Sequence, residues 1–331
     1  MTDGVSAERI QQLGPSFRAS KAVLSAVELG LFTELARGPL DASTLARRLG
    51  IHEPAASHFF DVLVSLGLLG CDDGFYSNNP EPELYLDRAK PSYVGAMAEM
   101  QSAYGYRLWG SLTEALRTGK PQAETAANLG QEDPARIRRL ALAVTGGSIM
   151  SARALSRDFP WERYQSFVDV GTAEGCLPVR LVLDHTHLEG IGFDLPPLGP
   201  VFDEYVSASG VTERLRFHPG DLLVDPLPRA DVVVIGNVLC DLDLEGKQLL
   251  FARAHAAVAD GGAIVAYGSI IDDDRRSNAA ALLASLAAML QTAGAFCFTG
   301  AECRAWMEEA GFRDTRWERL EGPRSMVVGL K

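Results

Sequence analysis

The sequence lacks the features that mark metal-binding, disulfide-stapled, secreted or membrane-spanning proteins. Its five cysteines are widely scattered, and no CxxC pair or Cys/His cluster has the spacing of a metal site, so we expect neither zinc nor structural disulfides. The N-terminus has no apolar segment typical of a secretory signal. The longest uncharged run, residues 277–301, is alanine-rich and broken by polar residues, which predicts a buried helix and a turn. We therefore expect a cytoplasmic protein without a membrane partner.

Basic residues are scarce as well. The 31 Lys and Arg residues stand against 43 Asp and Glu residues, which gives a formal net charge of −12. Such a charge argues against general binding of nucleic acid or of anionic membranes. The phosphate-binding GxxxxGKS/T loop is also missing, which disfavours a hydrolysable nucleoside triphosphate. The 331 residues are 47% hydrophobic, enough for a large core, and the length favours two domains.

Residues 1–95 predict a small, mostly helical domain with a winged-helix pattern. The helical segments are expected to break at Gly30 and to resume after the cap residue Asp41, and a DG turn at Gly74 predicts a hairpin. The helix that would enter a DNA groove starts at Glu53 and carries acidic but no basic residues, so DNA binding is not expected. The apolar excess on these helices is better explained by burial against a second subunit, which predicts a homodimer.

Residues 96–165 predict a helical section that links the two domains or caps a substrate. Methionine and aromatic side chains recur there at near-helical spacing. Such a stripe packs in a core more often than it lines a site, but adaptable Met side chains beside aromatic rings also suit a flat apolar substrate. The lining candidates are Met97, Met100, Tyr104, Trp109 and Met150.

From residue 166 onward, apolar strand-like runs alternate with helical stretches. This order predicts an α/β fold over 166–331 with a doubly wound, mostly parallel sheet, whose ligands bind at the carboxyl ends of the strands. An edge hairpin is expected after Gly311. The strand candidates are 167–170, 188–193, 215–218, 232–235, 263–267 and 325–330.

Three acidic residues accompany the first three predicted strands. Asp169 lies in the first strand, directly before a turn that contains Gly171 and Gly175. Asp194 closes the second strand about twenty residues later, at the offset where an acid accepts hydrogen bonds from a ribose diol. Asp221 follows the third strand and is suited to the exocyclic amine of an adenine. Together these features predict a nucleoside-containing ligand.

The glycine turn does not suit a dinucleotide. Ala173 stands where the full fingerprint has glycine, and Glu174 would repel a pyrophosphate at the entry of the following helix. Leu222, next to Asp221, is placed to pack on the face of an adenine ring. A cationic sulfonium ligand without phosphate therefore fits this site better than NAD.

Four motifs lie at residues 171–175, 192–196, 220–222 and 310–312. Together they resemble those of the S-adenosylmethionine-dependent O-methyltransferases that act as dimers on phenolic and polyketide small molecules. The resemblance covers essentially the whole chain and implies a Rossmann-like class I methyltransferase domain preceded by an all-α/winged-helix dimerisation domain. It also implies S-adenosylmethionine or S-adenosylhomocysteine as the cofactor. The expected cofactor contacts are Asp169, Gly171, Gly175, Asp194, Leu195, Asp221, Leu222, Gly236 and Asn237.

The acid/base positions depart from the family pattern. After the fourth strand the family usually has Leu-His-Asp-Trp, whose histidine removes a proton from the acceptor hydroxyl. Here Cys240 stands at the histidine position, while Asp241 is retained. The family's two further acidic positions fall at Gly268 and near Cys297. We take Cys240 and Asp241 as the catalytic candidates, and we expect Cys240, Gly268 and Cys297 to line the substrate site.

Cys240 is a poor substitute for a general base, because burial raises a thiol pKa above its reference value of ~8.5. No Lys or Arg lies between Arg229 and Lys247 to activate it. Three functions remain open. The first is a methyltransferase (EC 2.1.1.-) whose small aromatic or polyketide-type acceptor is already nucleophilic at carbon, nitrogen or an acidic oxygen. The second is a repurposed member that binds the cofactor while catalysing a cyclisation, rearrangement, hydroxylation or decarboxylation. The third is a catalytically silent partner subunit.

Overall fold

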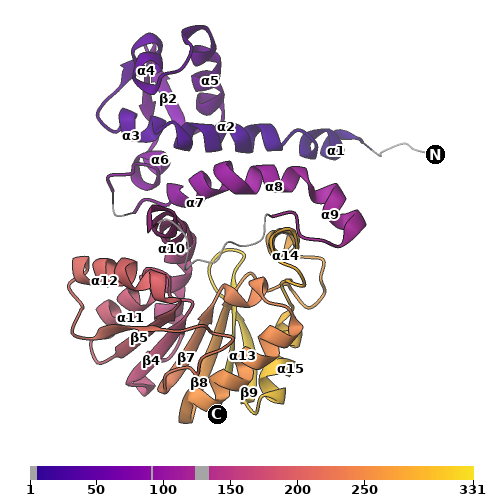
Figure 1. Cartoon of the computed structure of the whole chain (residues 1–331). Coiled ribbons are helices and arrows are strands. Elements are labelled where there is room, and N and C mark those ends of the chain that lie inside the picture. The colour runs from indigo at the N-terminus through magenta and orange to yellow at the C-terminus, as the bar shows by residue number, and fades with distance from the viewer. Residues whose placement is uncertain (1–5, 91, 124–133) are drawn as a thin grey trace. The chain divides into compact units, whose positions relative to one another are not determined.

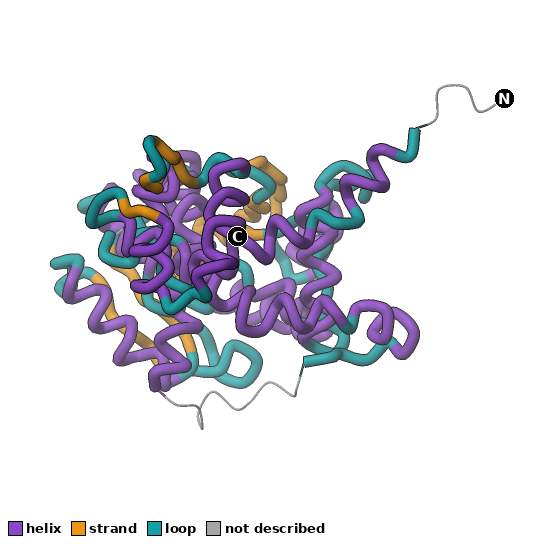
Figure 2. Tube along the Cα trace, turned by 90° about the horizontal axis from the view of Figure 1, so that it is seen from above, coloured by secondary structure: helices purple, strands orange, loops and turns teal. Residues whose placement is uncertain are grey.

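The chain divides into two compact units, Met1–Arg107 and Leu108–Lys331, in a computed structural model that describes residues 6–90, 92–123 and 134–331 (Figure 1). The boundary between the units falls within the section that the sequence predicts as a helical linker or cap, residues 96–165. Among the described residues, more lie in helices than in strands (Figure 2). Among the described helices, none is both long enough and apolar enough to cross a membrane.

The first unit combines short helices with a small three-stranded sheet. Gly30 has φ 72°, a left-handed conformation that glycine adopts without steric cost, and it separates α2 from α3 as predicted. Asp41 caps α4 by accepting a hydrogen bond from the Thr44 N–H at 2.9 Å. The predicted hairpin is formed by β2 and β3, and β1 pairs with the other side of β3. The elements are α1 (Glu8–Leu13), α2 (Phe17–Glu28), α3 (Leu31–Leu35), β1 (Leu40–Asp41), α4 (Ala42–Leu49), α5 (Glu53–Ser65), β2 (Leu69–Asp72), β3 (Phe75–Asn78), α6 (Pro80–Tyr85) and α7 (Gly95–Met100).

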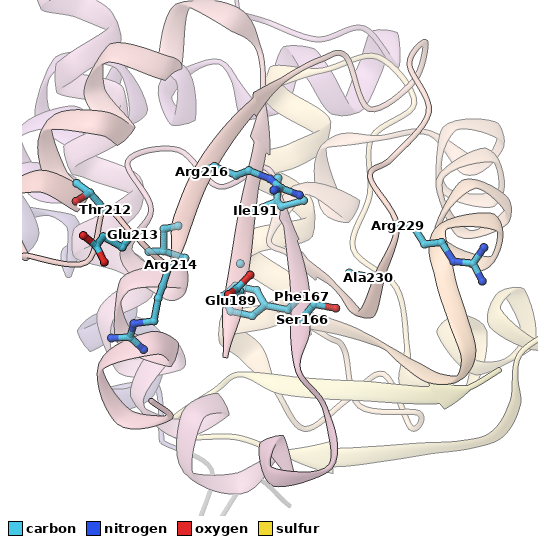
Figure 3. Close-up of a pocket in the computed structure, with 12 residues that line it drawn as sticks. Ser166, Phe167, Glu189, Ile191, Thr212, Glu213, Arg214, Arg216, Arg229 and Ala230 are labelled. Atoms are coloured by element: carbon cyan, nitrogen blue, oxygen red, sulfur yellow. The ribbon is translucent and has the colours of Figure 1, made fainter. Parts of the chain in front are cut away.

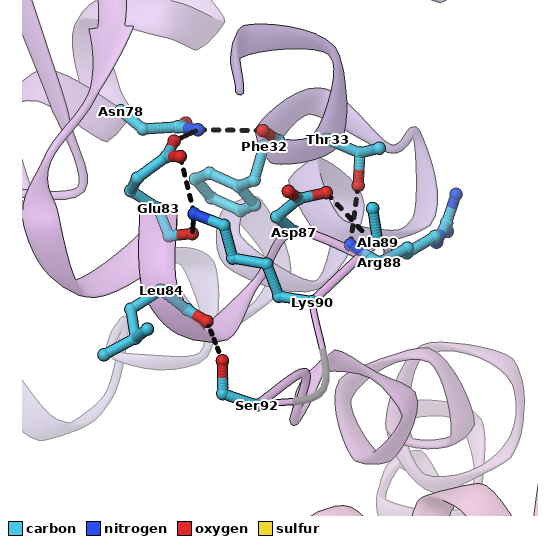
Figure 4. Close-up of polar contacts among 10 residues, drawn as sticks. All are labelled: Phe32, Thr33, Asn78, Glu83, Leu84, Asp87, Arg88, Ala89, Lys90 and Ser92. Atoms are coloured by element: carbon cyan, nitrogen blue, oxygen red, sulfur yellow. Dashed lines mark hydrogen bonds and ion pairs between the residues drawn. The ribbon is translucent and has the colours of Figure 1, made fainter. Parts of the chain in front are cut away.

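A polar network ties three of these elements together (Figure 4). The Lys90 ammonium donates to the Glu83 carboxylate and to the Glu83 carbonyl oxygen, each at 2.6 Å. The Glu83 carboxylate also accepts from the Asn78 side-chain amide, which in turn donates to the Phe32 carbonyl oxygen, both at 2.8 Å. Because Phe32 lies in α3, Asn78 in β3 and Glu83 in α6, the network fixes the hairpin and the segment after α6 against the helical core of this unit.

The first part of the predicted helical section is not one continuous helix. α7 passes into a π-helical turn (Gln101–Gly105), then into α8 (Tyr106–Gly110) and, after Ser111, into α9 (Leu112–Thr118). A Cβ at Gly105 would lie 2.0 Å from Oε1 of Gln101. Glycine therefore leaves room for the Gln101 side chain beside the wider turn.

The second unit is built on a seven-stranded sheet with the order β6-β5-β4-β7-β8-β10-β9. Neighbouring strands from β6 to β8 are parallel, and β9 and β10 form the hairpin that was expected after Gly311. β10 pairs antiparallel with β8, so β9 is the edge strand. In this register Ser325, the first residue of β10, lies opposite Gly268, the last residue of β8. The strands are β4 (Ser166–Val170), β5 (Glu189–Asp194), β6 (Leu215–Pro219), β7 (Ala230–Gly236), β8 (Val258–Gly268), β9 (Arg313–Arg319) and β10 (Ser325–Leu330).

Helices cover both faces of this sheet, and alternate strand residues face each layer (Figure 1). In β7, Val232 and Val234 pack on the side of α11 and α12, whereas Val233 and Ile235 pack on the side of α13 and α15. Because both faces are buried, the strand is a continuous apolar run rather than an alternating one. The remaining helices are α10 (Pro134–Asp158), α11 (Cys176–Asp184), α12 (Gly199–Ala208), α13 (Leu244–Ala257), α14 (Ala279–Gln291) and α15 (Gly300–Glu309).

Candidate active site

The predicted cofactor residues fall at the carboxyl edge of the seven-stranded sheet. The chain changes direction across the sheet there, since β5 and β6 lie on one side of β4 while β7 and β8 lie on the other. In open α/β sheets, ligands bind at the crevice outside such a switch point. The turns that follow β4, β5, β6 and β7 contribute the candidate residues.

The turn after β4 depends on residues with positive φ. Gly171 and Gly175 have φ 76° and 91°, and a Cβ at Gly171 would lie 2.5 Å from Cγ1 of Val238. Ala173 is also left-handed, with φ 50°. The turn thus keeps a left-handed residue at the position where a glycine is missing, at a modest conformational cost for alanine.

Asp194 closes β5 with its carboxylate directed at this turn. Oδ2 accepts a hydrogen bond from the Ala173 N–H and Oδ1 accepts one from the Leu195 N–H, both at 2.8 Å. Burial raises the pKa of Asp194, and the two backbone N–H groups oppose that shift. A carboxylate offers about four lone-pair sites, so capacity remains to accept hydrogen bonds from the two hydroxyls of a diol.

Two further acids near the turn are buried. Asp169 is 4% exposed, and burial raises its pKa to about 7, although the nearby Thr172 side chain opposes the shift. Glu174 is 3% exposed, and burial raises its pKa as well.

Asp221 and Leu222 follow β6 in the turn next to Asp194. The Gly220 N–H donates to the Asp194 carbonyl oxygen at 2.9 Å, which joins the two turns. Oδ1 of Asp221 accepts from the Leu223 N–H at 2.8 Å. Leu222 is partly buried against the hydrophobic core on the α13 side of the sheet. The three predicted acids thus belong to adjacent strands of one sheet edge.

The ends of β7 and β8 meet at Gly236, Asn237 and Gly268. Asn237 has φ 60°, and its N–H donates to the Tyr267 carbonyl oxygen at 3.0 Å. Gly268 has φ 149°, and a Cβ there would lie 3.0 Å from Oδ1 of Asn237. A Cβ at Gly236 would lie 2.5 Å from the Tyr267 ring. A side chain at Gly268, where the family resemblance expects a carboxylate, would therefore be strained and would crowd Asn237.

Cys240, Asp241 and Cys297 form the part of the edge that we call the acceptor wall, together with Gly268. The Cys240 thiol donates to the Ser269 carbonyl oxygen at 3.7 Å. Its contact with Cys297 and its burial raise the pKa of the Cys240 thiol, so it stays protonated at neutral pH. Asp241 is exposed, yet protein atoms crowd its carboxyl group, and this desolvation raises its pKa to about 6. Asp241 is therefore mostly ionised at neutral pH, whereas the Cys240 thiol is not.

Lys247 lies beside the acceptor wall and was not predicted. It is 0% exposed on the buried face of α13, where its ammonium donates to the Leu242 carbonyl oxygen and lies 3.6 Å from the centroid of the Phe296 ring. Burial lowers the pKa of Lys247. The charge of Lys247 opposes the rise in the Cys240 pKa but does not reverse it. One sequence signal was available, because Lys247 precedes Leu250 and Phe251 by three and four positions, the spacing of one helix face.

Arg324 also reaches the site without having been predicted. It directly precedes β10, and its Nη1 donates to Oδ1 of Asn237 at 2.5 Å. Burial lowers the pKa of Arg324. No sequence pattern indicates this contact, since 87 positions separate the two residues and only strand pairing brings them together.

The predicted substrate-lining residues are divided between the units. Met97, Met100 and Tyr104 belong to the first unit, whereas Trp109 and Met150 belong to the second. Met150 is 44% exposed on α10. It lies two positions after Ser148, whose hydroxyl accepts from Asn237 at 3.4 Å, and two helical positions are about 200° apart. Met150 thus points away from Asn237, and the lining role of the Met and aromatic residues stays a prediction.

A separate pocket lies at the opposite edge of the sheet (Figure 3). Its lining comes from the amino ends of β4 to β7 and includes Phe167, Ile191 and Ala230. None of the predicted site residues lines it. In doubly wound sheets the ligand crevice is at the carboxyl ends, so we assign this pocket no role in the site.

Comparison with known proteins agrees with this geometry. The O-methyltransferase domain matches residues 109–313, and the O-methyltransferase dimerisation domain matches residues 12–88. The chain belongs to the O-methyltransferase family. The tetracenomycin polyketide synthesis 8-O-methyl transferase TcmO of Streptomyces glaucescens is 41% identical over 97% of this chain and 96% of its own length. The N,N-dimethyltransferase OxyT of Streptomyces rimosus is 38% identical over 95% of this chain and 93% of its own.

The O-methyltransferase fold extends over the whole chain. The crystal structure of human N-acetylserotonin methyltransferase in complex with SAM matches with a TM-score of 0.91 and 25% identity, covering 100% of this chain and 99% of that one. The chain is therefore an S-adenosylmethionine-dependent methyltransferase (EC 2.1.1.-), with a Rossmann-like class I domain preceded by a helical dimerisation domain. It is related to both O- and N-methyltransferases of natural-product pathways.

Proposed function

We propose that this O-methyltransferase relative methylates a small aromatic or polyketide-type intermediate without the histidine base usual in its family. The acceptor is already nucleophilic, as an enolate carbon, an amine or an acidic phenol. Cys240 takes the histidine position. The proposal joins two parts of the sheet edge, a cofactor-binding part and the acceptor wall.

The residues of the cofactor part fit S-adenosylmethionine or S-adenosylhomocysteine. Gly171 and Gly175 carry no side chain into the turn, and a Cβ at either would clash with Val238 or Phe202. Asp194 retains acceptor capacity for a ribose diol, and Asp221 with Leu222 would hold the adenine. Asp169, Leu195, Gly236 and Asn237 complete the expected contacts. When bound, the cofactor supplies an electrophilic methyl group on a sulfonium sulfur.

The surroundings of Cys240, whose thiol donates to the Ser269 carbonyl oxygen and whose burial raises its pKa, carry the acceptor half of the proposal. A general base typically contributes about 10²–10⁴-fold to the rate, and a neutral thiol cannot supply that. Holding a nucleophilic acceptor in line with the methyl group still gives a large advantage through proximity and orientation. Asp241 is ionised near neutral pH, and we keep it as the remaining candidate for proton transfer.

Two measurements test this function. Calorimetric titration with S-adenosylhomocysteine should show binding to the purified protein, and its absence would overturn the cofactor half. Labelled methyl from S-adenosylmethionine should then appear on at least one member of a panel of hydroxylated naphthalenes and anthraquinones with an aminated analogue. Conversion of an acceptor equally well with S-adenosylhomocysteine would instead establish the non-methylating alternative.

We further propose that the protein is a homodimer through its N-terminal domain. The first unit exposes Ile10, Leu13 and Phe17 at 76%, 63% and 52%, which is unusual for side chains of this size on a monomer surface. Sedimentation should give a mass near twice 35.7 kDa. Phe17→Glu should shift the protein toward monomer, because a buried carboxylate opposes association. A monomeric wild-type protein would contradict the proposal.

A further inference from the structure

Arg324 brings a positive charge to the acceptor wall. Ser325 pairs with Gly268 at the carboxyl end of β8, so the residue before Ser325 must lie at the same edge. The turn that carries Arg324 is fixed on both sides. The Leu320 N–H donates to the Arg324 carbonyl oxygen at 3.0 Å, and the Asn278 side chain donates to the Pro323 carbonyl oxygen at 2.8 Å. The position of Arg324 is therefore set by the fold rather than by a free loop.

The guanidinium has few partners. Nη1 donates to Oδ1 of Asn237, and within the described part of the chain Arg324 forms no ion pair. Tyr267 and Cys240 are the ionisable groups close enough to act on its charge, and both are protonated at neutral pH. Arginine keeps its charge even where burial lowers its pKa, because its reference pKa lies above 12. Most of its five N–H donors are thus available to a ligand.

Asn237 fixes the orientation of the Arg324 guanidinium. Its backbone is held by Tyr267, and its side-chain amide donates to Ser148 on α10 at 3.4 Å. Its Oδ1 fills the space next to Gly268 and accepts from the guanidinium, so a cation lies close to the position where the family resemblance expects a carboxylate.

We propose that Arg324, oriented by Asn237, forms a subsite that holds the ionised oxygen of the acceptor, a phenolate or the enolate of a 1,3-dicarbonyl. This inference rests on the proposed function and narrows its acceptor class, because a cation favours an anionic acceptor over an amine. A guanidinium binds an oxyanion through charge-assisted hydrogen bonds and favours its ionised form. The subsite thereby replaces proton removal by a base with stabilisation of an acceptor that has already lost its proton to solvent.

The test uses 1,2-dihydroxyanthraquinone, a tricyclic phenol whose visible absorption changes on ionisation, with the full-length protein saturated with S-adenosylhomocysteine. The wild-type protein should lower the ionisation midpoint of the bound dye by about one pH unit or more relative to water. Arg324→Gln keeps an N–H donor toward Asn237 but removes the charge, and it should return the midpoint to that of the free dye. Arg324→Lys should restore most of the shift.

Arg313→Met is the matched control, because Arg313 is exposed at the start of β9, paired with the opposite end of β10. It should leave the midpoint at the wild-type value. An equal midpoint for wild type and Arg324→Gln would overturn the inference and leave Arg324 as a pin of the hairpin alone. The inference would also be overturned if the wild-type protein did not bind the dye, or bound only its neutral form. If Arg324→Gln fails to unfold cooperatively, the comparison is made with Arg324→Met.

The two proposals fail separately. A midpoint shift that depends on Arg324, without transfer of labelled methyl to any acceptor, would leave the subsite standing and refute the methylating function. Methyl transfer without a midpoint shift would leave the methylating function standing and refute the subsite.

Discussion

The cofactor part and the acceptor wall lie along the same carboxyl edge of one sheet but differ in charge. On the cofactor part, Asp169 lies in β4, Asp194 ends β5 and Asp221 follows β6. The acceptor wall offers the protonated Cys240 thiol, Gly268 and the Asp241 carboxylate, and the side chains of Lys247 and Arg324 approach it. A negative side suits a sulfonium cofactor, and the Arg324 guanidinium suits an anionic acceptor. The fold shared by the family fixes where cofactor and acceptor meet. Side chains from segments far apart in the sequence determine which class of acceptor the site favours.

Replacing Asp194 by alanine should have the largest effect of the substitutions considered, a loss of affinity for the cofactor. Each hydrogen bond to a charged group contributes about 1.5–3 kcal/mol, so losing the two bonds to a ribose diol should raise the Kd for S-adenosylhomocysteine by about 100-fold or more. Calorimetry measures this change. Asp203→Ala, at an exposed acid of α12, is the control and should bind normally. A change of less than tenfold for Asp194→Ala would mean that this carboxylate does not anchor the cofactor.

Lys247 tests whether the acceptor wall depends on a buried cation. Lys247→Ala would leave a cavity against Phe296 and an unpaired Leu242 carbonyl group, so it should lower the free energy of unfolding by about 2–5 kcal/mol. Lys247→Met keeps the volume and the aromatic contact and should cost only about 1–2 kcal/mol. Urea unfolding distinguishes them, and equal losses would argue against the packing role.

Gly268 tests whether steric crowding explains the missing carboxylate at the end of β8. Gly268→Ala places a Cβ at positive φ and 3.0 Å from Asn237, whereas Gly261→Ala meets only open space at φ 78°. A left-handed alanine costs about 1–2 kcal/mol, and we expect Gly268→Ala to lose at least about 1 kcal/mol more than Gly261→Ala. Urea unfolding of the two variants side by side measures the difference. Equal losses would remove the steric reason for the missing carboxylate.

Asp169 links pH to stability on the cofactor side. Its folded pKa of about 7 lies above the reference value of 3.8, so the folded state binds more protons between these values. Its contribution to stability is therefore lost as pH rises from about 4 to about 7. Asp169→Asn should gain at least about 1 kcal/mol relative to wild type between pH 5 and pH 7. Urea unfolding at pH 5, 6 and 7 measures the gain, and parallel pH curves would contradict the burial of an acid here.

Cys240→Ala should have the smallest effect. A protonated thiol does not remove protons, so kcat should fall by less than about tenfold, with an unchanged pH dependence of kcat/KM. Cys303→Ala, a buried thiol on α15, controls for the loss of side-chain volume. The pH–rate profile with labelled S-adenosylmethionine provides the readout. If the pH profile of kcat/KM for Cys240→Ala lacked a pH-dependent limb that the wild-type profile shows, Cys240 would be the general base.

Local patterns account for the parts that were predicted. Alternating apolar runs and helical stretches place β4 to β8 and the closing hairpin, because a strand buried on both faces must be apolar along its length. The turn at Gly171 and the acid at Asp194 follow from backbone and hydrogen-bonding needs within a few residues. The helical character of the first part of 96–165 follows from the same kind of pattern, but the π-helical turn at residues 101–105 does not, since it depends on how one side chain packs.

The amino-acid sequence by itself determined the order of the elements, the glycine turn and the acids of the cofactor part, because each is encoded by neighbours along the chain. It also placed Cys240 and Gly268 at positions where the family resemblance expects acid/base groups. Only the tertiary structure decided the charge of the acceptor wall. Antiparallel pairing of β10 with β8 carries Arg324 to Asn237, and packing of α13 buries Lys247 beside Phe296. Contacts between residues tens of positions apart arise from the packing of whole elements, which no local pattern specifies.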